Sequence, residues 1–251
     1  EGIDGFTLGM KRQAGAERFG AVTEYAEVTE VALRENPKRI VTTSGEFLSK
    51  TVVIATGANP KELGLDGESE LVGRGLHYCA HCDGRFYKNK VVAVVGGGNS
   101  AAEDALYLSH LAKKVYVIHR RDSLRATKIY HEPLMKAENV EFLWDSAVSD
   151  FVVDGRIKGV VVENLKYGSK QEIEIDGLFV SIGRRPATSL FSELEKDAGG
   201  YIVADESTKT SIGGVFAVGD VRTKVLRQVV TAVGDGAVAA YYAEEFLSLN
   251  E

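Results

Sequence analysis

The 251-residue sequence predicts an α/β fold with a Rossmann-like unit, and three observations lead to that prediction. Residues 91–95 form an apolar, β-branched run that ends at a glycine-rich turn. Residues 101–111 then carry apolar side chains at helical spacing, and residues 115–118 form a second apolar run. Strand, glycine turn, helix and strand in this order are typical of Rossmann-like folds.

The composition limits the class of protein. With 44% hydrophobic residues and a formal net charge of −6, the chain is mildly acidic and has enough apolar material for a core. No apolar run reaches the ~18 to 20 residues of a membrane-spanning helix, and we recognise no signal peptide. The scarcity of cysteine favours a reducing compartment. We therefore expect a cytoplasmic protein with neither a membrane nor a nucleic acid as its partner.

The first 60 residues predict a helix, a small antiparallel sheet and a buried strand. Residues 5–19 have apolar side chains at helical spacing, and Gly20 ends that helix. Strand-like alternation then occurs at 21–29, 31–33, 40–42 and 47–48. Residues 52–58 are a buried strand that closes on the turn Thr56-Gly57, before the boundary signal Asn59-Pro60.

The only two cysteines of the chain, Cys79 and Cys82, stand in a C-x-x-C motif. This spacing can close a small redox disulfide by thiolate attack. Ordinary buried thiols are one alternative. A metal site with the nearby His77 and His81 is another, but zinc sites draw on two separated ligand pairs and no second pair exists here, so we expect no metal.

The glycine-rich turn matches G-x-G-x-x-A at Gly96, Gly98 and Ala101, with Asn99 and Ser100 between the last two. Its preceding strand and following helix strengthen an otherwise weak motif. Such a turn lets the backbone approach a pyrophosphate closely and directs N–H groups at a helix start toward negative charge. The sequence therefore predicts that a dinucleotide binds here.

The residues after the second strand predict which nicotinamide cofactor binds. An NAD site usually has an acidic residue about 20 positions beyond the glycines, whereas an NADP site needs cations for the 2′-phosphate. This chain has His119, Arg120, Arg121 and, one helical turn later, Arg125. Arginine forks match phosphate oxygens, which favours NADPH over a solvated basic helix start.

The rest of the chain predicts further strands, at 140–144, 148–153, 157–162, 173–175 and 178–182. Gly183-Arg184-Arg185-Pro186 suits a connector between domains. A buried strand at 215–218 ends in Gly219-Asp220, and a small-residue helix start follows from Gly234. A carboxylate at such a strand end can bond to a polyol chain or can cap the helix, and both interpretations stay open for Asp220.

Three segments together resemble the pyridine-nucleotide domain of low-molecular-weight thioredoxin reductases, which are class II pyridine nucleotide-disulfide oxidoreductases. They are Cys79 to Gly84, Val94 to Ala101 and His119 to Arg125, in this order and at these spacings. The resemblance implies an FAD/NAD(P)-binding, Rossmann-like flavoprotein with two dinucleotide-binding domains. Only one dinucleotide turn is present, so we expect the first, N-terminal FAD-binding βαβ unit to be missing.

The same resemblance implies the domains and the flavin-binding residues. Residues 1–62 would be the remainder of the first part of the FAD domain, 63–188 the NADPH-binding domain with its redox-active C-x-x-C, and 189–251 the C-terminal part of the FAD domain. By resemblance, the FAD-binding residues are Thr56, Gly57, Gly219, Asp220, Val221, Arg227, Gln228 and Val229.

The implied activity is that of a thioredoxin-disulfide reductase in the form of a homodimer. Electrons would pass from NADPH through FAD to Cys79 and Cys82, and then to a thioredoxin-like protein. By resemblance Cys82 is nearer the flavin and Cys79 attacks the partner. Asp83 is the candidate acid that protonates a leaving thiolate, or simply the first residue of an Asp-Gly turn.

His81 departs from the threonine common at this position and opens an alternative. The flavoprotein subunits of alkyl hydroperoxide reductases share C-x-H-C-D-G, but they typically use NADH, and the arginine cluster argues against that cofactor. A fragment whose thiols never cycle, and a ferredoxin-driven flavin reductase, are further hypotheses. A ferredoxin-driven enzyme would have no use for the arginines.

Overall fold

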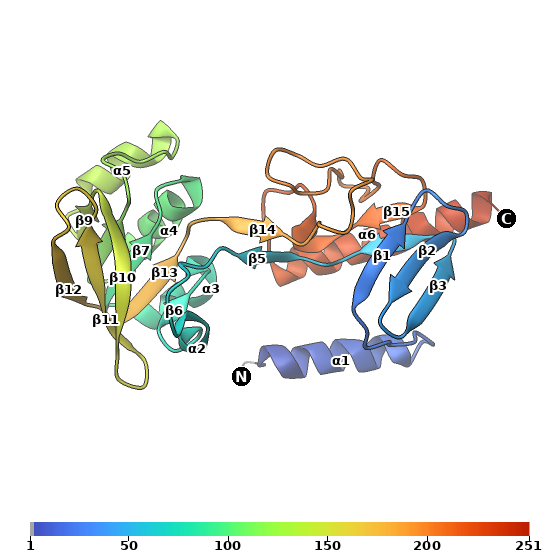
Figure 1. The fold of residues 1–251 in the computed structure, drawn as a ribbon, viewed down its shortest axis with the longest axis horizontal. Coiled ribbons are helices and arrows are strands. Elements are labelled where there is room, and N and C mark those ends of the chain that lie inside the picture. Colours follow the sequence, from blue (N-terminus) through green and yellow to red (C-terminus); the bar gives the residue numbers. More distant parts are fainter. Residues whose placement is uncertain (1–2, 251) are drawn as a thin grey trace. The chain divides into compact units, whose positions relative to one another are not determined.

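The computed structural model describes residues 3–250, and the chain forms two compact units (Figure 1). One unit contains the chain up to Gly57 and again from Pro186, and the other runs from Ala58 to Arg185. The strands β5 (Ala58–Pro60) and β14 (Arg184–Pro186), which pair with each other, lie where the chain passes between the units. The assignment of FAD and NADPH to domains bounded at residues 62 and 188 stays a prediction.

The contiguous unit is built on a five-stranded parallel sheet of order β6-β13-β7-β8-β9. Its strands are β6 (Leu76–His77), β7 (Val91–Val95), β8 (Lys114–Ile118), β9 (Val140–Leu143) and β13 (Gly177–Val180). Successive side chains of a strand point to opposite faces, and β7 is apolar throughout because both of its faces are covered. Val92 and Val94 pack on the side of helix α4 (Asn99–Ser109), whereas Ala93 and Val95 belong to a second cluster.

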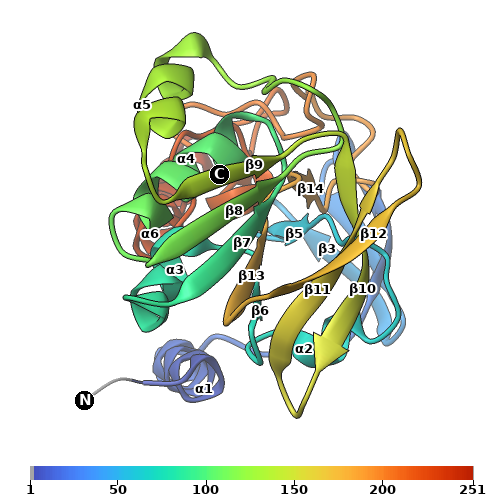
Figure 2. The same cartoon turned by 90° about the vertical axis from the view of Figure 1, so that its left-hand side faces the viewer.

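That second cluster joins the parallel sheet to an antiparallel sheet of order β10-β11-β12. The strands are β10 (Ser146–Val153), β11 (Ile157–Asn164) and β12 (Lys170–Glu174). Figure 2 shows α4 on one side of the parallel sheet and β10 to β12 on the other. The short helices are α2 (Glu68–Leu71), α3 (Ala80–Asp83), η1 (Gly84–Tyr87), η2 (Lys128–Tyr130) and α5 (His131–Lys136).

The unit that contains both termini has a separate core. Strands β1 (Val28–Ala32), β2 (Lys38–Thr42) and β3 (Gly45–Ser49) form an antiparallel sheet. Strand β4 (Val52–Ile54) pairs in parallel with β15 (Val215–Ala217), and the 3-10 turn η3 (Gly219–Val221) follows β15. The helices are α1 (Gly5–Glu17) and α6 (Val229–Leu249).

The predicted strands of the Rossmann-like unit, the predicted first helix and the small antiparallel sheet are confirmed, with shifts of a few residues at their ends. The strand expected over 21–29 is wrong for residues 21–27, which belong to no strand, although the Glu27 carbonyl accepts a hydrogen bond from the Thr43 N–H at 2.9 Å. Val22 is 91% exposed and Tyr25 80% exposed, so their alternation does not reflect a buried sheet face.

The last helix begins earlier than its small residues suggested. The sequence placed its start near Gly234, whereas α6 begins at Val229. The reason is local, because the Thr231 hydroxyl accepts a hydrogen bond from the Gln228 N–H at 3.1 Å and closes a capping box. Glutamine at the first position departs from the serine or threonine of the usual capping box, so the sequence does not mark this helix start.

Candidate active site

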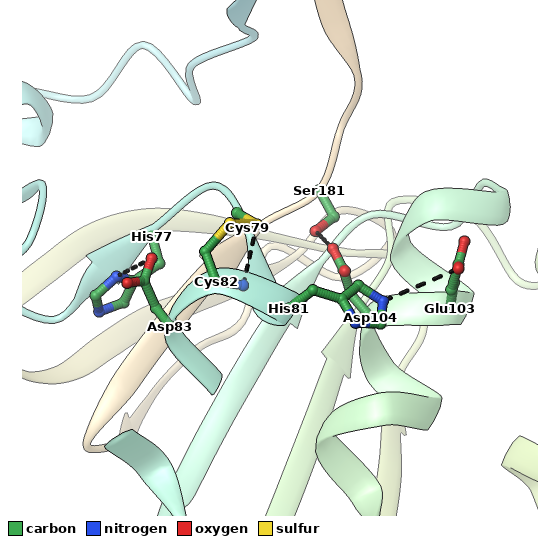
Figure 3. Close-up of a disulfide and its surroundings, with 8 residues drawn as sticks. All are labelled: His77, Cys79, His81, Cys82, Asp83, Glu103, Asp104 and Ser181. Carbon is green, nitrogen blue, oxygen red and sulfur yellow. Dashed lines mark hydrogen bonds and ion pairs between the residues drawn. A yellow bond between two sulfur atoms is a disulfide. The ribbon is translucent and has the colours of Figure 1, made fainter. Parts of the chain in front are cut away.

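Cys79 and Cys82 form a disulfide at the start of helix α3, in the contiguous unit (Figure 3). Strand β6 ends at His77, and Cys79 caps α3, so the two sulfur atoms lie where the chain turns from strand to helix. The Cys82 N–H donates to the Cys79 sulfur at 3.1 Å. Cys79 is partly buried and Cys82 is exposed. A donor on the Cys79 sulfur stabilises negative charge there, which suits a thiol that must ionise.

The His77 imidazole contacts Asp83, the residue after Cys82 (Figure 3). Its Nδ1 is 3.1 Å from an Asp83 carboxylate oxygen, and its Nε2 is 2.7 Å from the Tyr87 hydroxyl. Burial lowers the pKa of His77, and Asp83 raises it by less. In the sequence His77 stands out only as a possible metal ligand, and no local pattern predicts its contact with Asp83.

His81, the residue between Ala80 and Cys82, faces helix α4. Its ring lies 4.4 Å from the Tyr107 ring, and its Nε2 is 3.9 Å from a Glu103 carboxylate oxygen. Both partners of this ion pair are about half exposed, at 48% and 57%, so the pair contributes little to stability.

The glycine-rich turn joins β7 to α4 and has almost no room for side chains on its inner side. A Cβ at Gly96, where φ is +145°, would lie 2.5 Å from the Ser181 carbonyl oxygen, and one at Gly97 would lie 2.2 Å from the His119 ring. At Gly98 a Cβ would meet no atom of the described chain within 4 Å. The third position of the motif, Ala101, is buried in the core. The open side of the turn is therefore at Gly98.

A pocket of about 670 Å³ opens at this side of the turn. Among the residues that line it are five from the turn and helix start, Gly96, Gly97, Gly98, Asn99 and Ser100, and three from the basic cluster, His119, Arg120 and Arg125. Arg121 is exposed and is not among the described lining residues. The loop that carries Arg125 is tied to the turn, since the N–H groups of Arg125 and Ala126 donate to the Gly97 carbonyl at 2.7 and 3.1 Å.

The His119 ring lies in the wall of this pocket and is almost fully buried. It is 3% exposed, and its Nε2 has no hydrogen-bond partner within residues 3–250. Burial lowers the pKa of His119, and the positive charges of Arg125, Arg121 and Arg120 lower it further. The ring is therefore neutral at pH 7, and the pocket wall has one unused polar atom beside a group of cations.

The residues expected to bind FAD lie at the carboxyl edge of β4 and β15. These strands pair in parallel, so the turn at Thr56-Gly57 and the turn at Gly219–Val221 follow neighbouring strand ends. Gly57 and Gly219 have φ values of +71° and +70°, which only glycine adopts readily. The Thr56 hydroxyl donates to the Ala187 carbonyl at 2.7 Å.

Arg227, Gln228 and Val229 surround the start of α6. The Arg227 guanidinium lies 4.0 Å from the centre of the Tyr201 ring, and its Nε has no partner among the described residues. Gln228 caps α6, and Val229 is 60% exposed. These three positions therefore combine a fixed cation with an exposed apolar side chain.

A buried ionic cluster beneath the Gly219 turn escaped the sequence analysis. Asp235 accepts two hydrogen bonds from Arg222, both at 2.8 Å, and one each from Lys224 and the Gly219 N–H, also at 2.8 Å. Burial alone would raise the pKa of Asp235, but these donors outweigh it and lower the pKa. No sequence signal marks the cluster, because its charges are ordinary surface residues by composition.

Two classes of site are not found in the part of the chain that the structure describes. No group of three or more His, Cys, Asp or Glu side chains is placed to hold a metal ion. Over residues 3–250, none of the helices combines the length and the apolar composition needed to span a membrane.

Comparison with known proteins gives a consistent result. The sequence profile of the family described as pyridine nucleotide-disulphide oxidoreductase matches residues 3–236. The chain is 42% identical over 247 residues to the thioredoxin reductase of Treponema pallidum, covering 98% of this chain and 80% of that protein. It is 43% identical to the thioredoxin reductase of Listeria monocytogenes, covering 98% of this chain and 78% of the relative.

Solved structures agree with these relatives. The crystal structure of thioredoxin reductase from Streptococcus pyogenes superposes with a TM-score of 0.91 at 41% identity, covering 98% of this chain and 81% of that one. Thioredoxin reductase from Giardia duodenalis also gives 0.91, at 36% identity, with 98% and 82% of the two chains covered.

Proposed function

The chain belongs to the pyridine nucleotide-disulphide oxidoreductase family, and from this premise we propose that it is an NADPH-dependent thioredoxin-disulfide reductase. The observation that carries the proposal is one unit that contains both a C-x-x-C disulfide and a nucleotide pocket with a basic wall. The curated relatives that cover most of this chain are named thioredoxin reductases, which favours this activity over that of an alkyl hydroperoxide reductase flavoprotein.

The pocket residues fit a dinucleotide with a 2′-phosphate. Gly98 leaves space at the start of α4 where a pyrophosphate can approach N–H groups of the backbone. Arg120 and Arg125 line the same pocket as donors for phosphate oxygens. Arg121 contributes positive charge from outside the lining.

Fewer features support FAD binding at the carboxyl edge of β4 and β15. The unpartnered Arg227 Nε and the glycine turns at Gly57 and Gly219 are the features that support it. We assign FAD to Thr56, Gly57, Gly219, Asp220, Val221, Arg227, Gln228 and Val229 as part of this proposal. Bound FAD would supply the exchange of two electrons between a nicotinamide and a disulfide.

The chain's own residues carry out the thiol chemistry. With the cystine reduced, the Cys79 thiolate attacks a sulfur of the substrate disulfide and releases one substrate thiolate. Asp83 is the proposed acid for that thiolate. The Cys82 thiolate then attacks the Cys79 sulfur, which re-forms the cystine and releases the second substrate thiolate. The dithiol loses two electrons, and the substrate disulfide gains them.

The proposal also includes a thioredoxin-like protein as substrate, a homodimer and a cytoplasmic location. The thioredoxin-like substrate follows from the names of the relatives. The homodimer follows from the family resemblance, and the cytoplasmic location follows from the low cysteine content. The molar mass of the flavin-loaded protein in solution, measured by light scattering, tests the homodimer.

The decisive experiment compares NADPH with NADH in the flavin-loaded full-length protein. Replacing Arg120 and Arg125 together by alanine should raise the KM for NADPH at least about 100-fold, because two charge-assisted hydrogen bonds of ~1.5 kcal/mol or more each are lost. The KM for NADH should change little. Arg74→Ala, at an exposed arginine of the same unit, is the control and should leave both constants unchanged.

Two outcomes would contradict the assignment. Equal changes for both coenzymes would show that the arginines do not bind the 2′-phosphate. A clear preference of the unmodified protein for NADH would instead favour the alkyl hydroperoxide reductase alternative.

A further inference from the structure

The His77 ring uses both of its nitrogens in the protein interior. His77 is 8% exposed, and it lies between the Asp83 carboxylate and the Tyr87 hydroxyl (Figure 3 shows the first contact). An ionised carboxylate only accepts hydrogen bonds, so Nδ1 carries the proton and donates to Asp83. Nε2 is then an acceptor, and the Tyr87 hydroxyl donates to it. The two contacts therefore select one tautomer of a neutral imidazole.

Packing fixes the orientation of this ring. The Phe179 ring stacks on it with centroids 5.2 Å apart and an interplanar angle of 27°, and the Tyr87 ring meets it edge-on at 5.2 Å. His77 and Phe179 are partners in the parallel pairing of β6 with β13. Tyr87 fits only because residue 177 is glycine, where a Cβ would lie 2.3 Å from the tyrosine ring. The N–H group on Nδ1 therefore points at the Asp83 carboxylate.

Burial keeps His77 neutral at pH 7, against the opposing charge of Asp83. Burial lowers its pKa, the Asp83 charge raises it, and Arg156 on the β10–β11 hairpin lowers it. Tyr87 also faces it, and burial raises the pKa of that tyrosine, while the charge of Arg156 lowers it and the charges of Asp83 and Asp176 raise it. The contact with Asp83 is thus a hydrogen bond from a neutral donor, and it persists without any change of charge on the ring.

We propose that His77 is a positioning residue for Asp83: its Nδ1–H fixes the carboxyl group beside the Cys79–Cys82 dithiol for proton transfer to the leaving thiolate. This inference rests on the function proposed above. Asp83 takes up a proton released as the dithiol ionises and returns it to the sulfur that leaves the substrate, so no further proton source is needed. His77 touches neither substrate nor sulfur in this scheme.

Thiol–disulfide exchange of the reduced 251-residue chain tests the inference without flavin or coenzyme. Stopped-flow rates are measured with two substrates. Glutathione disulfide releases an alkyl thiolate, which needs a proton, and a dithiobis(nitrobenzoate) releases an aromatic thiolate of low pKa, which does not. Asp83→Asn should slow the first reaction about 100-fold, the lower end of general acid catalysis, and should change the second by less than about threefold.

Two replacements of His77 separate positioning from packing. The asparagine amide N–H can take the place of Nδ1 and retain the donor to Asp83, whereas the longer glutamine places its amide where Nε2 was and faces Tyr87. With glutathione disulfide, His77→Gln should be about 10-fold slower than the unmodified chain, since a hydrogen bond to a charged group is worth ~1.5 kcal/mol. His77→Asn should recover most of that loss. In Asp83→Asn, the additional change His77→Gln should cause no further slowing.

The other possible results contradict either the role proposed for His77 or the role proposed for Asp83. Equal slowing of both substrates by His77→Gln, or equal rates for the glutamine and asparagine variants, would show that His77 acts only through packing. If Asp83→Asn is slow and His77→Gln is not, positioning by His77 is wrong while the proposed function stands. If Asp83→Asn is not slow, the acid role and this inference both fail, and the coenzyme comparison still decides the proposed function. Thermal unfolding of each variant identifies any loss of fold.

Discussion

At the residue scale, the substitutions that should cost most stability are those that break a buried ion pair. Arg222 is 2% exposed and Asp235 7% exposed, and Lys224 completes their cluster at 2.8 Å. Removing one partner of such a pair leaves an uncompensated charge in the interior. Asp235 also accepts a hydrogen bond from the Gly219 N–H, so it holds the turn that we assign to FAD binding.

We predict that Asp235→Asn lowers the free energy of unfolding by about 3–5 kcal/mol, as broken buried ion pairs do. Urea denaturation followed by circular dichroism measures it. Glu206→Gln is the control, because Glu206 is 98% exposed and 3.7 Å from Arg222, and it should cost at most a few tenths of a kcal/mol.

The same pair sets a pH dependence. The folded state lowers the pKa of Asp235, so its contribution is fully present above the unfolded pKa of about 3.9 and is lost as the pH falls below it. Between pH 5 and pH 2 the unmodified chain should lose more stability than Asp235→Asn does. Parallel pH profiles would show that the cluster does not contribute.

At the scale of one element, the turn between β7 and α4 assigns different tasks to neighbouring glycines. Gly97 has no room for a Cβ because the His119 ring lies 2.2 Å from where it would be. Gly98 has room among the described residues but faces the pocket. The sequence motif treats Gly98 as a fixed position and Gly97 as variable, so it ranks these two residues in the wrong order for stability.

This difference gives a paired prediction. Gly97→Ala should lower the free energy of unfolding by about 1–3 kcal/mol, as overpacking does, because His119 must move. Gly98→Ala should leave stability within about 0.5 kcal/mol but weaken NADPH binding at least tenfold, because its methyl group occupies the pocket. Denaturation curves and fluorescence titration with NADPH measure the two effects. Unchanged NADPH affinity in Gly98→Ala would place the pyrophosphate elsewhere.

At the scale of the whole molecule, the two units have separate cores. The apolar clusters built around β7 lie entirely within residues 58–185, and those around Ile54 and Phe216 use only the other unit. One unit is a single stretch of chain, whereas the other is assembled from two distant stretches. A domain that has its own core and is contiguous can fold alone.

We therefore predict that an isolated fragment of residues 58–185 unfolds cooperatively and binds NADPH. Circular dichroism and NADPH fluorescence are the measurements, and the same fragment with Gly98→Ala should unfold at a similar temperature without binding. A fragment without a cooperative transition would show that its core depends on the rest of the chain.

The sequence by itself determined the order of the elements and the chemistry. The β-branched run at 91–95, the glycine turn, the C-x-x-C and the arginine cluster are local patterns, because hydrogen-bonding period and turn geometry act over a few residues. The strands and helices that those patterns predicted in the Rossmann-like unit are confirmed.

Only the tertiary structure decided which side chains meet. His77 stacks on Phe179 because β6 pairs with β13, and Asp235 meets Arg222 because α6 packs beside the Gly219 turn. The three arginines look alike in the sequence, but only the structure shows that Arg120 and Arg125 line the pocket and that Arg121 is not among its lining residues. These contacts depend on which segments of the chain pack together, and a local pattern does not specify that.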